Sequence, residues 1–223
     1  MILGIYGSNK LGREIYEIAV RRNEQSSLWD QIVFIDDFNE EGNYFGTKRI
    51  KFDSLKNHKN EYECVIAIGE PSSREKLFQK LRDEDIRLTC LIDPTAIISP
   101  TAKIGNGTII CEYSTIHTGV ELGYNAFIQP FCTIGHDIKV GNHTVLSTLC
   151  APGGGVVFGE RVYVGMQSSL IELLTIGDDA IIGMGSAVFQ NVPAGATVVG
   201  NPGRITRGND EHKVFTSHDK KRG

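Results

Sequence analysis

The sequence has no apolar run close to the roughly 20 residues that a membrane-spanning helix needs, so we expect no membrane insertion. The start, Met1–Tyr6, lacks the basic region and cleavage site of a signal peptide and is typical of a first β-strand. The sequence also has no excess of positive charge, since its 23 Lys and Arg residues and 27 Asp and Glu residues give a net charge of −4. This balance indicates no nucleic-acid partner.

Cysteine is sparse and shows no pairing pattern. The count of five is odd, and there is no C-x-x-C pair and no export signal. We therefore expect reduced thiols in a cytoplasmic protein. The cysteines are Cys64, Cys90, Cys111, Cys132 and Cys150.

An internal repeat dominates the second half of the chain. Stepping by six from Ile98 to Val188 gives sixteen positions, of which only Pro152 interrupts an aliphatic or aromatic column. A second column of mostly small residues follows each member by four positions, for example Ala126 and Cys132. Neither the 3.6-residue period of a helix nor the period of two of an ordinary strand gives this pattern.

A period of six fits short strands separated by corners. Three hexads close one triangular coil, and the coils stack at strand spacing, roughly 4.8 Å, around one core. The abundant glycine, 25 residues and mostly after position 100, suits the tight corners.

Two segments resemble the hexapeptide-repeat acyltransferases. They are Asp93 to Ala102 with Ile104-Gly105, and Val192-Pro193-Ala194-Gly195 through Val199 to Arg204. The resemblance implies an all-β left-handed parallel β-helix, a homotrimer, and acetyl-CoA as co-substrate in the groove between adjacent prisms.

Residues 1–92 alternate between strand and helix patterns. We predict strands at 2–6, 32–35, 64–68 and 88–92, with helices at 12–22 and 71–82. This order predicts a small α/β domain with a parallel, Rossmann-like sheet. The turn Gly7 to Gly12 can approach a phosphate, and the acidic pair Asp36-Asp37 can accept a hydrogen bond from a ribose hydroxyl or a pyrimidine N–H. A plain turn and a solvated loop are the alternatives.

The whole chain, from about residue 2 to Arg204, resembles bacterial nucleotide-sugar N-acetyltransferases and the related sialic-acid O-acetyltransferases. The resemblance rests on Ile5-Tyr6-Gly7 with Gly12, Phe34 to Phe38, Ile66 to Gly69 with Arg74, and Asp93-Pro94. It implies that the nucleotide sugar is bound by Asn9, Lys10, Leu11, Asp36, Asp37 and Gly69. Asn9 and Lys10 depart from the family's small residues, and Lys10 can instead pair with a diphosphate.

His136 and Asp137 are the candidate catalytic residues. His136 follows the column member Ile134 by two positions, so its side chain is expected to point outward at a corner. An imidazole can accept the proton of an attacking amine near neutral pH, and the carboxylate of Asp137 can orient the ring. Gly154 lies three hexads, or one full coil, further on, where a backbone N–H can stabilise the thioester oxyanion.

The resemblance implies the same roles, with Gly154, Met166 and Met184 contacting the acetyl-CoA. One departure is Val145, which stands where relatives carry a second histidine; His143 is two residues earlier, and that role is not transferred to it.

We therefore predict three segments: a nucleotide-sugar domain (1–92), a β-helix acetyltransferase domain (93–204) and a polar tail (205–223). The predicted reaction is N-acetylation of a UDP- or dTDP-linked 4-amino-4,6-dideoxy sugar for surface polysaccharide synthesis, without a metal. O-acetylation of a sialic acid or another sugar is the alternative. Weaker alternatives are a zinc enzyme using His117, His136 and His143, and a non-catalytic scaffold.

Overall fold

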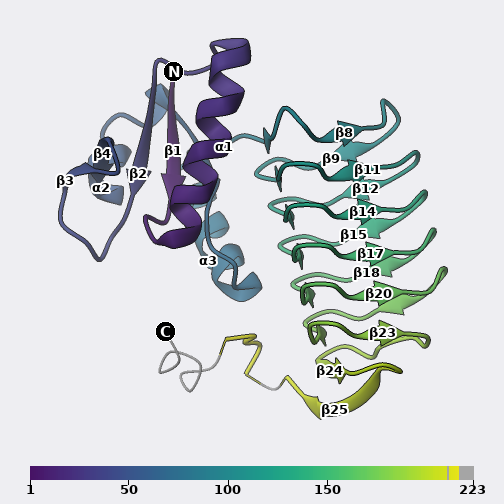
Figure 1. Cartoon of the computed structure of the whole chain (residues 1–223). Coiled ribbons are helices and arrows are strands. Elements are labelled where there is room, and N and C mark those ends of the chain that lie inside the picture. The colour runs from purple at the N-terminus through teal and green to yellow at the C-terminus, as the bar shows by residue number, and fades with distance from the viewer. Residues whose placement is uncertain (210, 216–223) are drawn as a thin grey trace.

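The computed structural model describes residues 1–209 and 211–215. An α/β domain at the N-terminus lies beside a tall β-helix, and the chain after the β-helix turns back toward the α/β domain (Figure 1). Within the described part of the chain, no helix is long and apolar enough to cross a membrane.

The front domain is built on a six-stranded sheet with the order β3-β4-β2-β1-β5-β6. The sheet is parallel apart from the β3–β4 hairpin, which the sequence analysis missed. The three central strands, β1, β2 and β5, are apolar, and each is buried at four successive positions. The strands are β1 (Ile2–Tyr6), β2 (Gln31–Ile35), β3 (Gly42–Tyr44), β4 (Thr47–Ile50), β5 (Tyr62–Ile66) and β6 (Arg87–Leu88).

Helices follow β1, β4 and β5. The first, α1 (Lys10–Ser26), begins after Asn9, whose side-chain oxygen accepts the Gly12 N–H at 3.2 Å and caps the helix. The third, α3 (Pro71–Asp83), has proline in its first turn, where a missing N–H costs nothing. Between them lie α2 (Phe52–Lys56) and a 3₁₀ turn, Lys59–Glu61.

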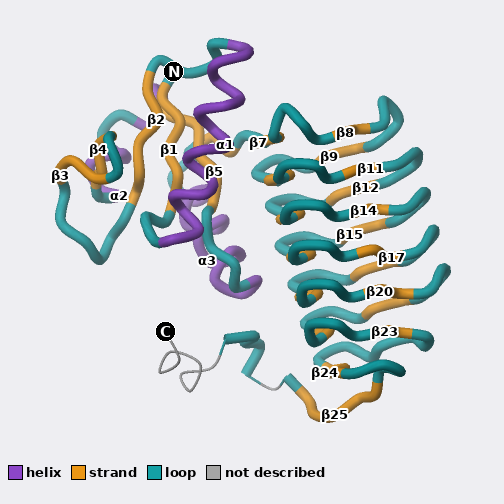
Figure 2. The backbone as a smooth tube through the Cα atoms, viewed as in Figure 1, coloured by secondary structure: helices purple, strands orange, loops and turns teal. Residues whose placement is uncertain are grey.

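The β-helix is a triangular prism of two-residue strands, seen as stacked coils in Figure 2. Most strands pair in parallel with the strand one coil away, as Thr115 does with Thr133. One face carries β7, β10, β13, β16, β19, β22 and β24, a second carries β8, β11, β14, β17, β20 and β23, and the third carries β9, β12, β15, β18 and β21.

The strand bounds follow the six-residue period. They are β7 (Leu91–Ile92), β8 (Ile97–Ile98), β9 (Lys103–Ile104), β10 (Ile109–Ile110), β11 (Thr115–Ile116), β12 (Glu121–Leu122), β13 (Phe127–Ile128), β14 (Thr133–Ile134), β15 (Lys139–Val140), β16 (Val145–Leu146), β17 (Ala151–Pro152), β18 (Val157–Phe158), β19 (Tyr163–Val164), β20 (Ser169–Leu170), β21 (Thr175–Ile176), β22 (Ile181–Ile182), β23 (Ala187–Val188), β24 (Ala196–Val199) and β25 (Arg204–Gly208).

The predicted strand 88–92 is wrong as a single element. The chain forms β6 and then β7, with Leu88 paired to Cys64 in the front sheet and Leu91 paired to Ile109 in the prism. Leu91 precedes Ile109 by one coil, so the first strand of the prism lies before residue 93.

The second face of the prism is interrupted in the middle. It consists of two three-stranded sheets, β14-β11-β8 and β17-β20-β23, so that no ladder joins β14 to β17. Pro152 of β17 has no N–H to donate. The interruption therefore lies directly before the corner that carries Gly154.

The front domain rests on the first face of the prism. Ile15 and Ile18 of α1 share a core with Ile109, Phe127 and Val145, which lie on that face. This packing buries apolar surface from both parts and so joins them.

A fully buried arginine strengthens the junction. The Arg74 guanidinium donates to the carbonyl oxygens of Ile66 (2.7 Å) and Ile68 (3.0 Å) and to that of Asn125 (2.8 Å) on the prism. Burial lowers the pKa of Arg74 to about 9. Because its bonds go to both parts, Arg74 fixes the front domain against the prism.

The predicted tail begins inside β25, which pairs antiparallel with β24. Residues 211–215 continue to the front domain, whereas Asp210 and residues 216–223 lie outside the described residues.

Candidate active site

His136 and Asp137 occupy an exposed corner of the prism, between β14 and β15. Nδ1 of His136 lies 3.0 Å from Oδ2 of Asp137, and the two side chains are 65% and 70% exposed. Asp137 has a left-handed backbone with φ of 57°, a conformation that Asp tolerates better than most residues. That turn lets two adjacent side chains meet, so Asp137 orients the imidazole with Nε2 available to a substrate.

Gly154 lies directly against the histidine ring. A Cβ atom at this position would lie 2.5 Å from both Cε1 and Nε2 of His136, so any side chain here would require the ring to move. The next residue is bonded to the same coil, because the Gly155 N–H donates to the His136 carbonyl at 2.8 Å. The chain therefore brings Nε2 and the Gly154 backbone together, as the repeat of three hexads predicts.

Met166 and Met184 lie on a different corner. They follow β19 and β22, between the first and second faces, whereas His136 lies between the second and third. Both side chains are exposed, at 45% and 70%. Within one chain, the structure does not bring the two methionines to His136 and Asp137.

The predicted nucleotide residues gather at one edge of the front sheet. Asn9, Lys10 and Leu11 follow β1, Asp36 and Asp37 follow β2, and Gly69 follows β5. The strand order reverses at β1, which lies between β2 and β5, and open α/β sheets bind ligands at such a point, beyond the carboxyl ends of the strands. Leu11 and Gly69 face each other there, since a Cβ at Gly69 would lie 3.8 Å from Leu11 Cδ2.

Asp36 is buried, and its carboxylate is hydrogen-bonded mainly to the loop that follows it. Its carboxylate accepts hydrogen bonds from the Ser8 hydroxyl, from the Phe38 N–H at 2.9 Å and from the Asn39 N–H at 3.0 Å. Burial alone raises the pKa of Asp36, but the bonds from Ser8 and Asn39 outweigh it and hold that pKa below its ordinary value. Asp36 therefore shapes the loop.

The Asp37 carboxylate is partly engaged by neighbouring side chains. It accepts from Tyr6 Oη at 2.5 Å and from Lys80 Nζ at 2.7 Å. Burial raises the pKa of Asp37, and the bonds from Lys80 and Tyr6 bring it below the ordinary value. Asn9 is likewise engaged, as the cap of α1.

The loop after Asp37 carries a residue that sequence reasoning missed. Phe38 is 97% exposed, on a loop held from both sides by Asp36 and by Lys51, whose Nζ donates to the Asn39 carbonyl at 2.7 Å. Lys10 is exposed at the start of α1, where its charge faces solvent.

The three histidines of the zinc alternative do not meet. His136 is exposed on one corner, whereas His143 is buried on another, with Nδ1 3.0 Å from Asn125 Nδ2. Among residues 1–209 and 211–215, no three His, Cys, Asp or Glu side chains form a group that could hold a metal ion. All five cysteines are free.

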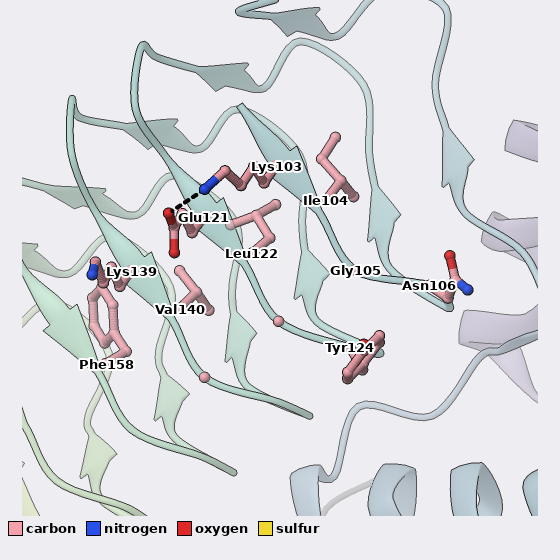
Figure 3. Close-up of a pocket in the computed structure, with 12 residues that line it drawn as sticks. Lys103, Ile104, Gly105, Asn106, Glu121, Leu122, Tyr124, Lys139, Val140 and Phe158 are labelled. Atoms are coloured by element: carbon pink, nitrogen blue, oxygen red, sulfur yellow. Dashed lines mark hydrogen bonds and ion pairs between the residues drawn. The ribbon is translucent and has the colours of Figure 1, made fainter. Parts of the chain in front are cut away.

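A shallow depression of about 570 Å³ lies on the third face of the prism (Figure 3). Lys103 and Glu121, bonded at 2.9 Å, are among the residues that line it, and none of the predicted site residues does. The candidate site is therefore the corner at His136 and the front-domain edge.

Residues 3–81 match the family described as the PglD N-terminal domain. This span contains all six predicted nucleotide residues.

Solved structures match nearly the whole chain. The acetyltransferase domain of PglB from Neisseria gonorrhoeae, in complex with acetyl coenzyme A, has a TM-score of 0.86 at 24% identity, covering 92% of this chain and 98% of that chain. PerB from Caulobacter crescentus, in complex with CoA and GDP-perosamine, has a TM-score of 0.85 at 25% identity, covering 93% and 98%. WeeI from Acinetobacter baumannii AYE has a TM-score of 0.70 at 26% identity, covering 92% and 100%.

A TM-score of 0.86 requires the same coil sense, because a coil of opposite hand does not superimpose. The predicted left-handed parallel β-helix behind a parallel α/β domain is thereby confirmed. Residues 3–81 are thus similar to the PglD N-terminal domain, and nearly the whole chain, with its left-handed β-helix, is similar in fold to these acetyltransferase structures.

Proposed function

We propose that the protein transfers the acetyl group of acetyl-CoA to the amino group of a nucleotide-linked 4-amino-4,6-dideoxy sugar. The observation that carries this proposal is the contact between His136 and Gly154 on an exposed corner. Further support is that PerB, at 25% identity, is seen with CoA and GDP-perosamine, and that a perosamine N-acetyltransferase of the same organism shares the fold.

The neutral amine attacks the acetyl carbonyl carbon. In this mechanism the Nδ1–H of His136 donates a hydrogen bond to Asp137, which leaves Nε2 to accept the proton that the amine loses. The carbonyl oxygen becomes an oxyanion, which the Gly154 N–H stabilises by hydrogen bonding in this mechanism. When the C–S bond breaks, the coenzyme A thiolate leaves and takes up a proton from the imidazolium, which returns the histidine to its neutral form.

We assign the nucleotide sugar to the front-domain edge. Lys10 and the N-terminus of α1 meet the diphosphate, and Leu11, Asp37 and Gly69 line the nucleoside. Asp36 acts by shaping the loop, and Asn9 by capping α1. The uridine, thymidine and guanosine diphosphates remain alternatives at this edge.

We propose further that the working enzyme is a cytoplasmic homotrimer. The front domain covers the face opposite the His136 corner, and Met166 and Met184 lie at another corner. A site that uses all three sets needs more than one copy, which a threefold arrangement supplies. Gly154 then contacts acetyl-CoA together with Met166 and Met184 of a neighbouring copy.

A thiol-release assay with acetyl-CoA and UDP-, dTDP- and GDP-linked 4-amino-4,6-dideoxyhexoses tests the reaction. We expect turnover with one nucleotide and its collapse in His136→Ala. Turnover only with sialic acids or other hydroxyl acceptors would replace N-acetylation by O-acetylation.

A mixing experiment tests the shared site. His136→Ala and Lys10→Glu are each expected to be inactive. If the two groups come from different copies, coexpressed chains recover about a quarter of wild-type activity. No recovery would mean that one chain carries the whole site.

A further inference from the structure

Residues 211–215, here called the C-terminal strap, return to the edge of the front sheet that lies beyond the carboxyl ends of its strands. Along the prism, the Asn209 side-chain amide donates to the Asp179 carbonyl at 3.0 Å and the Lys213 N–H donates to Asn209 Oδ1 at 2.9 Å. Figure 1 shows this part of the chain leaving the end of the β-helix toward the front domain. The strap is thus anchored on the prism before it reaches the front domain.

The far end of the strap is held by Glu70, the residue after Gly69. Both carboxylate oxygens accept the Val214 N–H at 3.1 Å, and one also accepts the Phe215 N–H at 3.0 Å. Glu70 precedes α3 but makes no side-chain cap to it. Its carboxylate instead fixes two successive backbone groups of the strap beside the turn that follows β5.

These bonds place the Phe215 ring at the edge of the front sheet, beside the point where the strand order reverses. A Cβ at Gly69 would lie 4.0 Å from Phe215 Cε2 and 3.8 Å from Leu11 Cδ2, so both side chains reach the same turn. On its other side the ring meets Tyr163 of the prism edge to face, with centroids 5.5 Å apart. Phe215 remains 49% exposed, so part of a supported aromatic ring is open at this edge.

We infer that Phe215 forms one wall of the nucleotide site, where its ring stacks on the base of a nucleoside diphosphate. This inference rests on the proposed function for the identity of the ligand. A planar base gains most from an aromatic ring that is already fixed, because little side-chain freedom is then lost on binding.

The test is the affinity of the intact protein for UDP, dTDP and GDP, measured by isothermal titration calorimetry, together with CoA. Stacking on an aromatic ring corresponds to roughly a tenfold change in affinity, so Phe215→Ala is expected to raise the dissociation constant of the bound nucleotide about tenfold. Phe215→Trp is expected to retain the affinity. The affinity for CoA stays unchanged in both.

Phe45→Ala is the matched control, because Phe45 is 43% exposed on the β3–β4 hairpin, away from this edge. Glu70→Ala, which frees the strap without removing the ring, is expected to lower the affinity for the same nucleotide. Unchanged affinity in Phe215→Ala would overturn the inference. Tighter binding would overturn it too, because it would mean that the ring obstructs the site.

The thiol-release assay separates this inference from the proposed function. Turnover by the wild type with unchanged nucleotide affinity in Phe215→Ala removes the inference alone. Nucleotide binding that depends on Phe215, without acetyl transfer to any amino sugar, removes the proposed function alone.

Discussion

The imidazole of His136 lies directly beside Gly154, so that a Cβ there would approach Nε2 to 2.5 Å. Gly154→Ala is therefore expected to displace the ring and lower kcat at least about 100-fold, the lower limit of what a general base contributes. Because the corner is on the surface, the unfolding temperature should change little. Steady-state kinetics and a thermal melt measure both.

A double variant makes this prediction sharper. If Gly154→Ala acts through the ring, it should cost little in the His136→Ala background. Two full, additive losses would instead show that the glycine acts independently of the histidine.

Asp137 orients His136 across 3.0 Å. Asp137→Asn is expected to lower kcat about tenfold or more, since the amide cannot stabilise an imidazolium as a carboxylate does. Asn tolerates the φ of 57°, so stability should be retained. Asp137→Ala should lose both activity and stability, and equal melting temperatures for the two variants would contradict this.

Arg74 joins the front domain to the prism through three carbonyl groups. Arg74→Met leaves these buried acceptors unpaired, and we expect the free energy of unfolding to fall by at least about 3 kcal/mol. Urea titration measures the loss. Arg82→Met, on the exposed side of α3, is the control and should lie within about 0.5 kcal/mol of wild type.

His143 gives the fold an acid-sensitive component. Burial lowers the pKa of His143, with Arg74 adding to the effect and Glu75 opposing it. The lowered pKa means that the neutral ring stabilises the folded state, and this stability is lost as pH falls below the unfolded value of about 6.5. The free energy of unfolding should therefore decline as the pH falls below about 6.5.

His143→Asn should remove that decline, and Asn suits the φ of 62° at this position. His58→Asn is the control, because the His58 side chain is 62% exposed. A decline of the same size in His143→Asn would assign it to other groups.

Periodicity alone predicts the prism and the contact at its corner. Residues 136 and 154 stack because the coil repeats after every three hexads, and no knowledge of their chemistry is needed. The front sheet follows from its apolar strands, whereas the polar β3–β4 hairpin carries no such signal.

Contacts between distant segments escape this reasoning. Arg74 bonds to Asn125, 51 residues away, and Glu70 to Phe215, 145 residues away, and neither pair is part of a repeat. The sequence also could not predict that Asp36 accepts hydrogen bonds from its own loop. An aspartate after a strand looks the same in the sequence whether its carboxylate binds a ligand or nearby N–H groups.

Because equivalent residues stack from coil to coil, the β-helix can change its length by whole coils without changing the contacts within each coil. Adding or removing one whole coil beyond the active corner would leave His136, Asp137 and Gly154 in phase, whereas a single inserted residue between His136 and Gly154 would rotate the corner out of register. Natural variants of this protein are therefore expected to gain or lose sequence in blocks of one whole coil.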